Sequence, residues 1–503
     1  MTDTPLVVLC IDAADPDLLV QWAAEGHLPS LHRAMERGWW GRVGGPELNI
    51  EHGAWVSLLS GISRAQHGYH YFRQLQTGSY DLRLVAGHEI DAPPFWAHLA
   101  DGARIAVVDV PDIRPIPGLR GVQLSDWAVH NPEAEPSALP ASVLTDAERV
   151  FGPHDPIEER LRSTEAEDRA IYERLLARVP RKGALVRHLI RGGDCDLVVA
   201  GFGEAHTGGH QLWTYRPGNP FGVADGPLTH ATRTLYQAID CELGRLVESV
   251  GEANVVVLSS VGMRDQFPMT GISEAFFREL GYQASPPPSS GRSWRPLDLA
   301  RRWLPESLRI ALSRRLPRER REALLADQYR TGTDWARTTA FSVPSAYATF
   351  ARINLQGREP EGTVAPEEYG ALLDRIEADF LKLVDPETGE RVVECVERTR
   401  DVFGPDASDD LPDLFVHWRP IPRFLRRVSH PRAELVQDEP EFFRESDHTR
   451  WGFMAAAGPA FDARGAVGEI DALDVAPTLW AALGRAPLPA FVGAPRHLAP
   501  LLD

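Results

Sequence analysis

Short segments made almost entirely of apolar residues constrain the fold of this chain most strongly. They are residues 5–11 (PLVVLCI), 104–110 (RIAVVDV), 196–202 (DLVVAGF) and 254–259 (NVVVLS). Continuous apolar, β-branched runs of this length are typical of strands that are buried on both faces, as in a parallel sheet. Apolar residues at helical spacing in residues 17–37 and 230–250 predict helices between these strands. The alternation of strands and helices indicates an α/β fold with a doubly wound sheet flanked by helices.

Charge and cysteine content narrow the class of protein. The net charge of −18 argues against nucleic acid as a partner, because binding a phosphate backbone requires a positive field. No apolar run approaches the roughly 18 residues of a membrane span, so we expect none. The four cysteines lie far apart in 503 residues, which is typical of a reducing compartment. We therefore expect a cytoplasmic protein that acts on a small-molecule substrate; the sequence does not indicate its oligomeric state.

Changes in composition predict four segments. After SPPPSSG at residues 285–291, eight arginines fall between positions 301 and 321. This insert is either an anion-binding or lipid-facing cap or a solvated helical hairpin with charged faces, and the hairpin is the favoured interpretation. The predicted segments are the first part of the core (1–283), the Arg-rich insert or cap (284–332), a smaller α+β lobe (333–430) and a return to the core (431–503).

Polar residues follow the predicted strands at the points where a ligand site is expected. Asp12 follows the first strand, residues 204–210 follow the third, and residues 260–265 follow the fourth. In a doubly wound sheet, ligands bind at the carboxyl ends of the strands. The sequence therefore predicts that these segments meet at one edge of the sheet.

Several ordered motifs resemble one known family. They are VVLCIDAADPDLLVQWAAEGHLPSLHRAMERGWWGRV, GAWVSLLSGISRAQHGYHYF, DLVVAGFGEAHTGGHQLW, NVVVLSSVGM, TDWARTTAF, INLQGREPEG, DHTRWGFMAAAGP and DALDVAPTLWAALG. Together they resemble the type I phosphodiesterase/nucleotide pyrophosphatase family of the alkaline phosphatase superfamily, over most of the chain except the Arg-rich insert. The resemblance implies an alkaline-phosphatase-like sheet, two metal ions, a Thr or Ser nucleophile, and phosphodiester or nucleotide pyrophosphate substrates.

Position-by-position comparison with the family pattern shows that one metal subsite is retained in altered form. Asp12 stands at the family's first metal-binding Asp, and His448 at its C-terminal metal-binding His. His210 matches the His of the middle motif, whereas the Asp of that motif is replaced by His206. The resemblance therefore implies three imidazoles where the family has one carboxylate and two imidazoles.

The other metal subsite lacks the family's nucleophile and two of its metal ligands. The family's hydroxyl nucleophile lies four residues before a Trp that matches Trp55, and that position is Glu51 here. A later metal-binding Asp-His pair is replaced by Ser260 and Val261. A two-metal clamp on the attacking and leaving oxygens is then not expected.

We therefore predict one divalent metal ion, Zn, Fe or Mn, bound by the three histidines. Glu51 or Asp12 is expected to act as a fourth ligand or as a general base, with open positions left for water or substrate. Each residue also has a plainer interpretation: Asp12 as a helix cap, Glu51 as the partner of an arginine, and His206 as a histidine hydrogen-bonded within a decayed site.

Four further polar residues lie in or near these motifs. Glu204 is a candidate to contact the metal-binding residues without binding the metal itself. Asp265 is a weak substitute for the lost Asp because it is displaced by several residues. His67 and His70 are expected to serve packing rather than chemistry.

Three classes of function follow. The first is a hydrolase in which a metal-bound water attacks a phosphate-ester-like or other small molecule. The second is a non-hydrolytic, redox or oxygen-using metalloenzyme, because imidazoles also suit redox metals. The third is an inactive family member with a binding role. The family resemblance favours the hydrolase.

Overall fold

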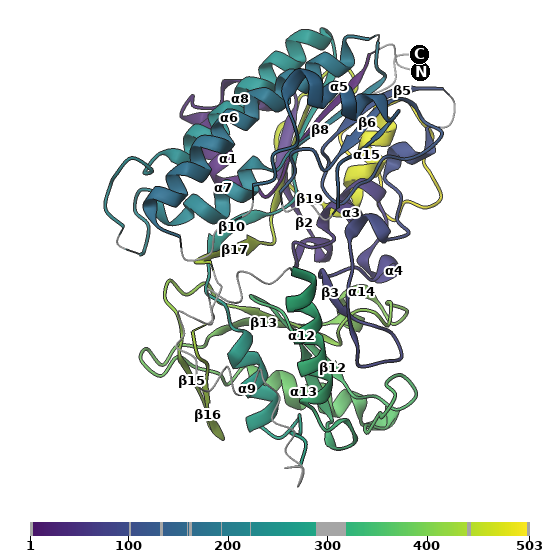
Figure 1. Cartoon of the computed structure of the whole chain (residues 1–503). Helices are drawn as coiled ribbons and strands as arrows, with labels where there is room; N and C mark the ends of the chain where they lie inside the picture. The colour runs from purple at the N-terminus through teal and green to yellow at the C-terminus, as the bar shows by residue number, and fades with distance from the viewer. Residues whose placement is uncertain are drawn as a thin grey trace. The chain divides into compact units, whose positions relative to one another are not determined.

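The computed structural model describes residues 4–99, 102–130, 134–157, 159, 163–192, 194–221, 223–287, 318–439 and 444–499. It divides into two compact units (Figure 1). Unit 1 comprises Met1–Phe72, Ala86–Asp265 and Arg444–Asp503, and unit 2 comprises Arg73–Val85 and Gln266–Phe443. The units thus divide the chain differently from the four predicted segments, since a hairpin from the first segment belongs to unit 2. Most of the Arg-rich insert, residues 288–317, lies outside the described residues.

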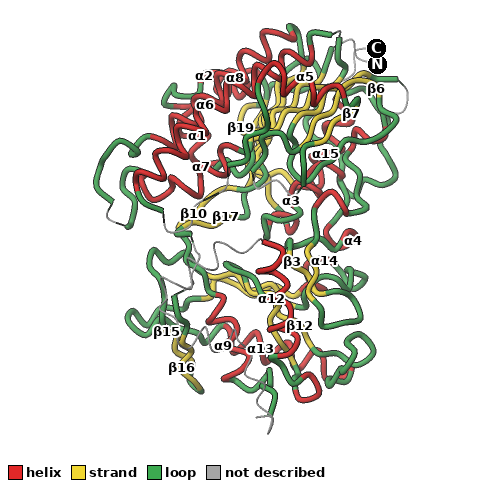
Figure 2. Tube along the Cα trace, in the orientation of Figure 1, coloured by secondary structure: helices red, strands yellow, loops and turns green. Residues whose placement is uncertain are grey.

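Unit 1 is built on a nine-stranded mixed sheet (Figure 2). The order of its strands is β19-β2-β18-β9-β1-β8-β5-β6-β7, and the five strands from β9 to β6 are parallel. Strands β18 and β7 run antiparallel to their neighbours. The bounds are β1 Leu6–Ile11, β2 Trp39–Gly44, β5 Arg104–Val108, β6 Arg120–Ser125, β7 Ser137–Leu139, β8 Leu197–Phe202, β9 Asn254–Ser259, β18 Gly452–Ala457 and β19 Gly465–Asp471.

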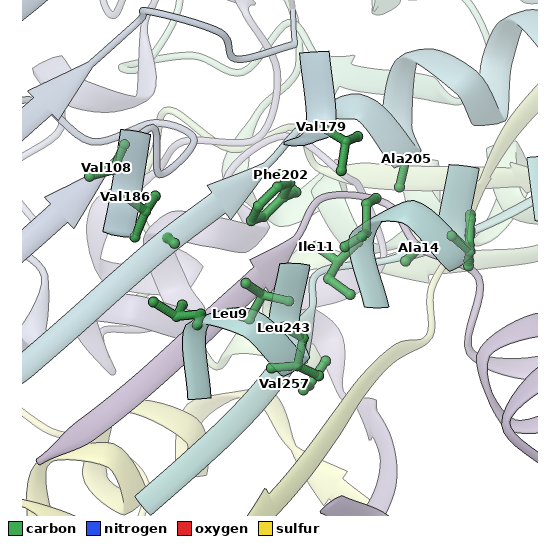
Figure 3. Packing of buried hydrophobic residues seen from close by; sticks show 14 of the residues in the cluster. Leu9, Ile11, Ala14, Val108, Val179, Val186, Phe202, Ala205, Leu243 and Val257 are labelled. Atoms are coloured by element: carbon green, nitrogen blue, oxygen red, sulfur yellow. The ribbon is translucent and has the colours of Figure 1, made fainter. Parts of the chain in front are cut away.

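Helices cover both faces of this sheet, which explains the apolar runs. Alternate residues of β1 enter two separate cores, with Val7 and Leu9 in one and Leu6 and Val8 in the other. The first core also contains side chains of α1, α2, α5, α6 and α8, and part of it is shown in Figure 3. The second contains side chains of α3 and α15. The bounds are α1 Pro16–Ala24, α2 Pro29–Arg37, α3 Ala54–Ser60, α4 Arg64–His67, α5 Ser142–Phe151, α6 Glu165–Ile190, α7 Glu204–Leu212, α8 Ala231–Val250 and α15 Val475–Ala482.

The four predicted strands are confirmed as β1, β5, β8 and β9, but the helix predicted over residues 17–37 is two helices. Helix α1 ends before Gly26, whose φ of 81° is a left-handed conformation that suits glycine. Helix α2 then begins at Pro29, and proline is favoured at the first position of a helix because it has no N–H to leave unbonded. The local turn chemistry therefore overrides the continuous apolar spacing.

A short antiparallel ribbon extends the end of β9. Strand β10 (Gly262–Asp265) pairs with β17 (Ser446–Thr449), and Met263 lies opposite His448. The C-terminal part of the chain is thereby fixed beside the carboxyl ends of the central strands.

Unit 2 has its own apolar core and a four-stranded antiparallel sheet of order β11-β12-β14-β13. Two hairpins, β3–β4 and β15–β16, belong to the same unit. The bounds are β3 Arg73–Leu75, β4 Leu82–Leu84, α9 Thr270–Glu279, α12 Arg318–Thr331, β11 Ala340–Val343, β12 Thr349–Ile353, α13 Tyr369–Phe380, β13 Val393–Arg398, α14 Thr399–Phe403, β14 Leu414–Trp418, β15 Arg427–His430 and β16 Ala433–Val436. Among the described residues of both units, no helix is long and apolar enough to cross a membrane.

Candidate metal centre

Three imidazoles converge at the carboxyl ends of the central strands. His206 and His210 lie one turn apart on α7, which begins directly after β8, and His448 lies on β17. The Nε2 atom of His210 is 3.1 Å from Nε2 of His206 and 3.1 Å from Nε2 of His448. The predicted histidine cluster is therefore present in the structure as a compact group.

Each imidazole is held at its other nitrogen by an oxygen atom. Nδ1 of His206 lies 2.8 Å from the Asp12 carboxylate, Nδ1 of His210 lies 3.1 Å from Ser446 Oγ, and Nδ1 of His448 lies 3.2 Å from the Gly262 carbonyl. A carboxylate and a carbonyl only accept hydrogen bonds, so at least two of these nitrogens carry the proton. This is the usual support of a metal-binding histidine, because it fixes the tautomer and the orientation of the ring.

The donor set fits a divalent metal ion. With the proton on Nδ1, Nε2 of His206 and Nε2 of His448 each offer a lone pair, and each lies 3.1 Å from Nε2 of His210. The three ligand atoms lie within 4.8 Å of one another. Zn, Fe and other transition metals accept imidazole nitrogen, so the chemistry of these residues suits such an ion.

Electrostatics keeps two of the histidines ready to bind a metal. Burial lowers the pKa of His448 to about 3, and it lowers the pKa of His210 well below its ordinary value. Burial also opposes the charged form of His206, but the neighbouring Asp12 carboxylate outweighs it and raises the pKa of His206. His448 and His210 are therefore neutral at physiological pH, whereas His206 holds its proton more strongly.

Asp12 is committed to hydrogen bonds on both carboxylate oxygens. Oδ1 accepts from Trp55 Nε1 at 2.7 Å and from Ser260 Oγ at 3.2 Å, while Oδ2 faces His206 at 2.8 Å. The residue is 4 % exposed, so these partners replace water. In this arrangement Asp12 orients His206, and the structure does not place it among the three atoms that converge.

Glu51 carries a negative charge beside the cluster. Its carboxylate lies 2.7 Å from Nδ1 of His52. Burial works against this charge, but the neighbouring His52, with a smaller contribution from His206, holds the pKa of Glu51 well below its ordinary value. The carboxylate is thus ionised and interacts with two of the three metal-binding candidates.

A buried arginine holds the loop that carries Glu51. Arg64 is 1 % exposed, and its guanidinium donates to the carbonyls of Glu47 at 2.5 Å, Ile50 at 2.9 Å and His52 at 2.8 Å. It also donates to the Tyr69 carbonyl at 3.1 Å. These bonds bracket Glu51 on both sides and fix the course of the main chain at that position.

Three residues that the sequence analysis missed adjoin the cluster. The ring of His130 stacks on that of His206 with 3.7 Å between centroids, and Nε2 of His130 is 3.4 Å from Glu159. Glu159 also pairs with Arg444, whose positive charge acts on His210. His130 and Glu159 lie in loops without periodicity, so no signal in the sequence points to them.

The remaining candidates have structural partners. Glu204 is fully buried and pairs with Arg178 at 2.7 Å and Lys182 at 3.3 Å, so it anchors the start of α7 to α6. Asp265 pairs with Arg216 at 3.4 Å. Val261 is buried in the second core.

His67 and His70 also have structural partners. The Tyr69 amide donates to Nδ1 of His67 at 3.1 Å, so Nε2 carries the proton and donates to Ser57 Oγ at 2.9 Å. Nδ1 of His70 lies 3.2 Å from the Gly68 carbonyl. Both contacts agree with the predicted packing role.

Comparison with known proteins identifies the class. The chain is similar to phosphonoacetate hydrolase from Sinorhizobium meliloti 1021, solved with phosphonoformate, with 16% identity, a TM-score of 0.50, and coverage of 96% of this chain and 95% of that one. It is also similar to murine ectonucleotide pyrophosphatase/phosphodiesterase 5, with 12% identity, a TM-score of 0.46, and coverage of 97% and 96%. The chain therefore shares its fold with phosphonoacetate hydrolase, and the predicted fold class, an α/β sheet flanked by helices, is confirmed.

Family membership follows from the sequence match. The type I phosphodiesterase / nucleotide pyrophosphatase family model matches residues 6–420, so the chain belongs to that family. It is an enzyme of the phosphoester hydrolase type, and the members of its family depend on metal ions. No curated protein sequence matches the chain.

Proposed function

We propose that the protein is a mononuclear metal-dependent hydrolase of a small, phosphate-ester-like substrate. The observation that supports this proposal is the convergence of three Nε2 atoms whose opposite ring nitrogens are all held by oxygen atoms. In this proposal His206, His210 and His448 hold one divalent ion, which is Zn, Fe or Mn. When bound, such an ion acidifies a coordinated water and polarises a substrate oxygen.

One ion rather than two is proposed because the second subsite lacks ligands. Val261 is apolar and buried, and Ser260 donates its hydroxyl to Asp12 at 3.2 Å. Asp12 itself is shared among Trp55, Ser260 and His206. The two-metal arrangement of the family therefore has no counterpart among these side chains.

Glu51 takes the role of proton acceptor in this proposal. It stands where the family has a hydroxyl nucleophile, and a carboxylate cannot form a phospho-Ser or phospho-Thr intermediate. Its low pKa keeps it ionised, and its interaction with His448 and His206 places its charge beside the ion that these residues hold. A carboxylate in that position can accept a proton from an attacking water, but its low pKa makes it a weak base, so this role rests on its place beside the ion and not on its basicity.

Arg444 supports an anionic substrate. Its positive charge acts on both His210 and His448, and its side chain is 24% exposed. Arg444 already pairs with Glu159, but a guanidinium has five N–H donors, so its remaining donors provide a partner for the charged end of a phosphate ester or phosphonate.

Metal reconstitution tests the proposal and separates it from the non-hydrolytic alternative. Metal-free protein would be loaded with Zn, Fe or Mn and assayed anaerobically and in air against phosphate monoesters, phosphodiesters, nucleotide pyrophosphates and phosphonoacetate. Zn-supported, oxygen-independent turnover of one of these classes is expected. Turnover that needs Fe or Mn together with oxygen would replace hydrolysis with the redox function, which a set of three imidazole ligands also suits.

Two variants locate the activity. Glu51→Gln keeps the volume of the side chain and removes its charge, so we expect it to bind the metal and lose turnover. Asp265→Asn is the matched control, because Asp265 pairs with Arg216 at 3.4 Å instead of facing the histidines. Equal losses in the two variants would contradict the role given to Glu51.

A further inference from the structure

A second group of metal-binding side chains lies in unit 2. Strand β13 is at one edge of the four-stranded sheet and pairs with β14. Cys395 and Glu397 lie on β13, and His417 lies on β14. One ligand atom from each of these residues lies within 4.8 Å of the other two.

A β-bulge brings these side chains to one face of the sheet. Val393 lies opposite Trp418, but Cys395 lies opposite His417, so two steps on β13 correspond to one step on β14. The shifted register also places Val396 opposite Val416. Without the bulge, Cys395 would lie opposite Val416 instead. Because side chains alternate along a strand, the bulge separates Cys395 and Glu397 from the core-facing valines and aligns them with His417.

The chemistry of the group is that of a zinc ligand set. Cys395 and Glu397 are partly buried and His417 is 8 % exposed, which limits competition from water. His417 Nε2 lies 3.0 Å from a carboxylate oxygen of Glu397. Ligands at about 2.0–2.3 Å from a tetrahedral zinc ion are themselves more than 3 Å apart, so small side-chain rotations suffice to surround an ion. A thiolate in the set selects soft or borderline ions over Mg²⁺ and Ca²⁺.

We propose that Cys395, Glu397 and His417 form a second metal site, which binds Zn²⁺ through one sulfur, one oxygen and one nitrogen atom and leaves a fourth position open. The ion replaces the thiol proton of Cys395, which is released to the solvent. It also joins the edge strand β13 to β14. This site is independent of the histidine cluster in unit 1, and it does not require the proposed hydrolase function.

Cobalt substitution tests the site, because this group is the one of the two candidate ligand groups among the described residues that contains sulfur. Full-length, metal-free protein, kept reduced with a phosphine, would be titrated with Co²⁺ while the ultraviolet and visible spectra are recorded. We expect a sulfur-to-cobalt charge-transfer band in the native protein and in His210→Ala, which damages the unit 1 cluster. Cys395→Ser should lose this band and bind one cobalt ion fewer, while the absorption of the unit 1 cluster remains.

Matched variants keep the outcome clear. Cys241→Ser changes an exposed cysteine on α8 and should retain the band. His417→Gln and Glu397→Gln keep side-chain volume, and each should weaken cobalt binding at this site by at least about 10-fold, because loss of a mere supporting partner of a ligand already costs about 10–100-fold. Circular dichroism of each variant would confirm folding.

Absence of a charge-transfer band in both native protein and His210→Ala would overturn the proposal. So would a band that survives in Cys395→Ser. An inactive protein that still shows the band would refute the proposed hydrolase function and leave the second site standing.

Discussion

Replacing Asp12 with Asn tests whether this carboxylate orients a metal ligand or binds the metal itself. Oδ1 accepts hydrogen bonds from Trp55 and Ser260, and Oδ2 faces His206. Asn has one acceptor oxygen, and the indole N–H of Trp55 can only donate. The oxygen therefore stays with Trp55, and the new NH₂ group faces Nδ1 of His206. That nitrogen must then accept, which moves its proton to Nε2, the atom that lies 3.1 Å from His210.

The expected loss follows from this change of tautomer. A protonated Nε2 cannot bind a metal, and loss of such a supporting partner typically costs about 10–100-fold in metal affinity. This corresponds to about 1.4–2.7 kcal/mol. If the amide adopts the opposite orientation, a buried donor remains unsatisfied and the free energy of unfolding falls by about 1–3 kcal/mol.

Competition with a chromogenic chelator measures the affinity, and thermal unfolding measures the stability. Ser260→Ala is the control, because it leaves the contact between Asp12 and His206 intact: it removes the longest of the three contacts of the carboxylate, at 3.2 Å, and the hydrogen bond from the Ala13 amide to Ser260 Oγ, at 3.3 Å. It should change metal affinity by about twofold, the low end of the net contribution of a hydrogen bond. Metal binding by Asp12→Asn within twofold of the native protein would refute the reasoning, and a loss far above 100-fold would assign Asp12 as a direct ligand.

Four other predictions concern the same centre. His206→Ala, His210→Ala and His448→Ala should each remove the ion of this cluster, measured by metal analysis after dialysis, and retention at full occupancy would contradict the ligand set. Glu51→Gln should lower turnover of the substrate identified by reconstitution by at least about 100-fold, within the range for a general base, and unchanged kcat would show that Glu51 is not the base. The native protein should hydrolyse generic aryl phosphodiesters very weakly. Glu51→Thr should not restore this activity, because Ser260 still stands at a metal-binding Asp position. Fast turnover by either protein would contradict the comparison with the family. Metal affinity should fall as the pH drops below the raised pKa of His206, by about tenfold per pH unit for one competing proton, and titrations at several pH values would refute this if the affinity stayed constant.

The sequence predicted the sheet well because its signal is local. Strand β1 is apolar at every position since both of its faces are buried, and this pattern is visible without any knowledge of its neighbours. The antiparallel partners were harder to predict: β18 pairs with β2, more than 400 residues earlier in the chain. The hairpin at residues 73–85 likewise joins unit 2 through long-range contacts that local periodicity does not encode.

The candidate site was predictable only where a motif exists. The spacing of His206 and His210, together with family position, led to three histidines that the structure brings together. The support of these histidines came from elsewhere: Ser446 Oγ and the Gly262 carbonyl are brought to them by the pairing of β10 with β17. The assignment of Asp12 and Glu51 as metal ligands and the cytoplasmic location stay predictions.

Arg64 holds the main chain of the loop that carries Glu51 without a hydrogen bond to the reactive side chain. Every hydrogen bond from its guanidinium goes to a main-chain carbonyl, and none goes to a side chain of the loop. Main-chain carbonyls are the same for every amino acid, so the course of residues 47–52 does not depend on which side chain stands at position 51. A family that normally presents a hydroxyl at this point can therefore present a carboxylate after one substitution, without refolding the loop. In evolutionary terms, the reactive side chain at position 51 can be exchanged while the main chain that carries it keeps its conformation.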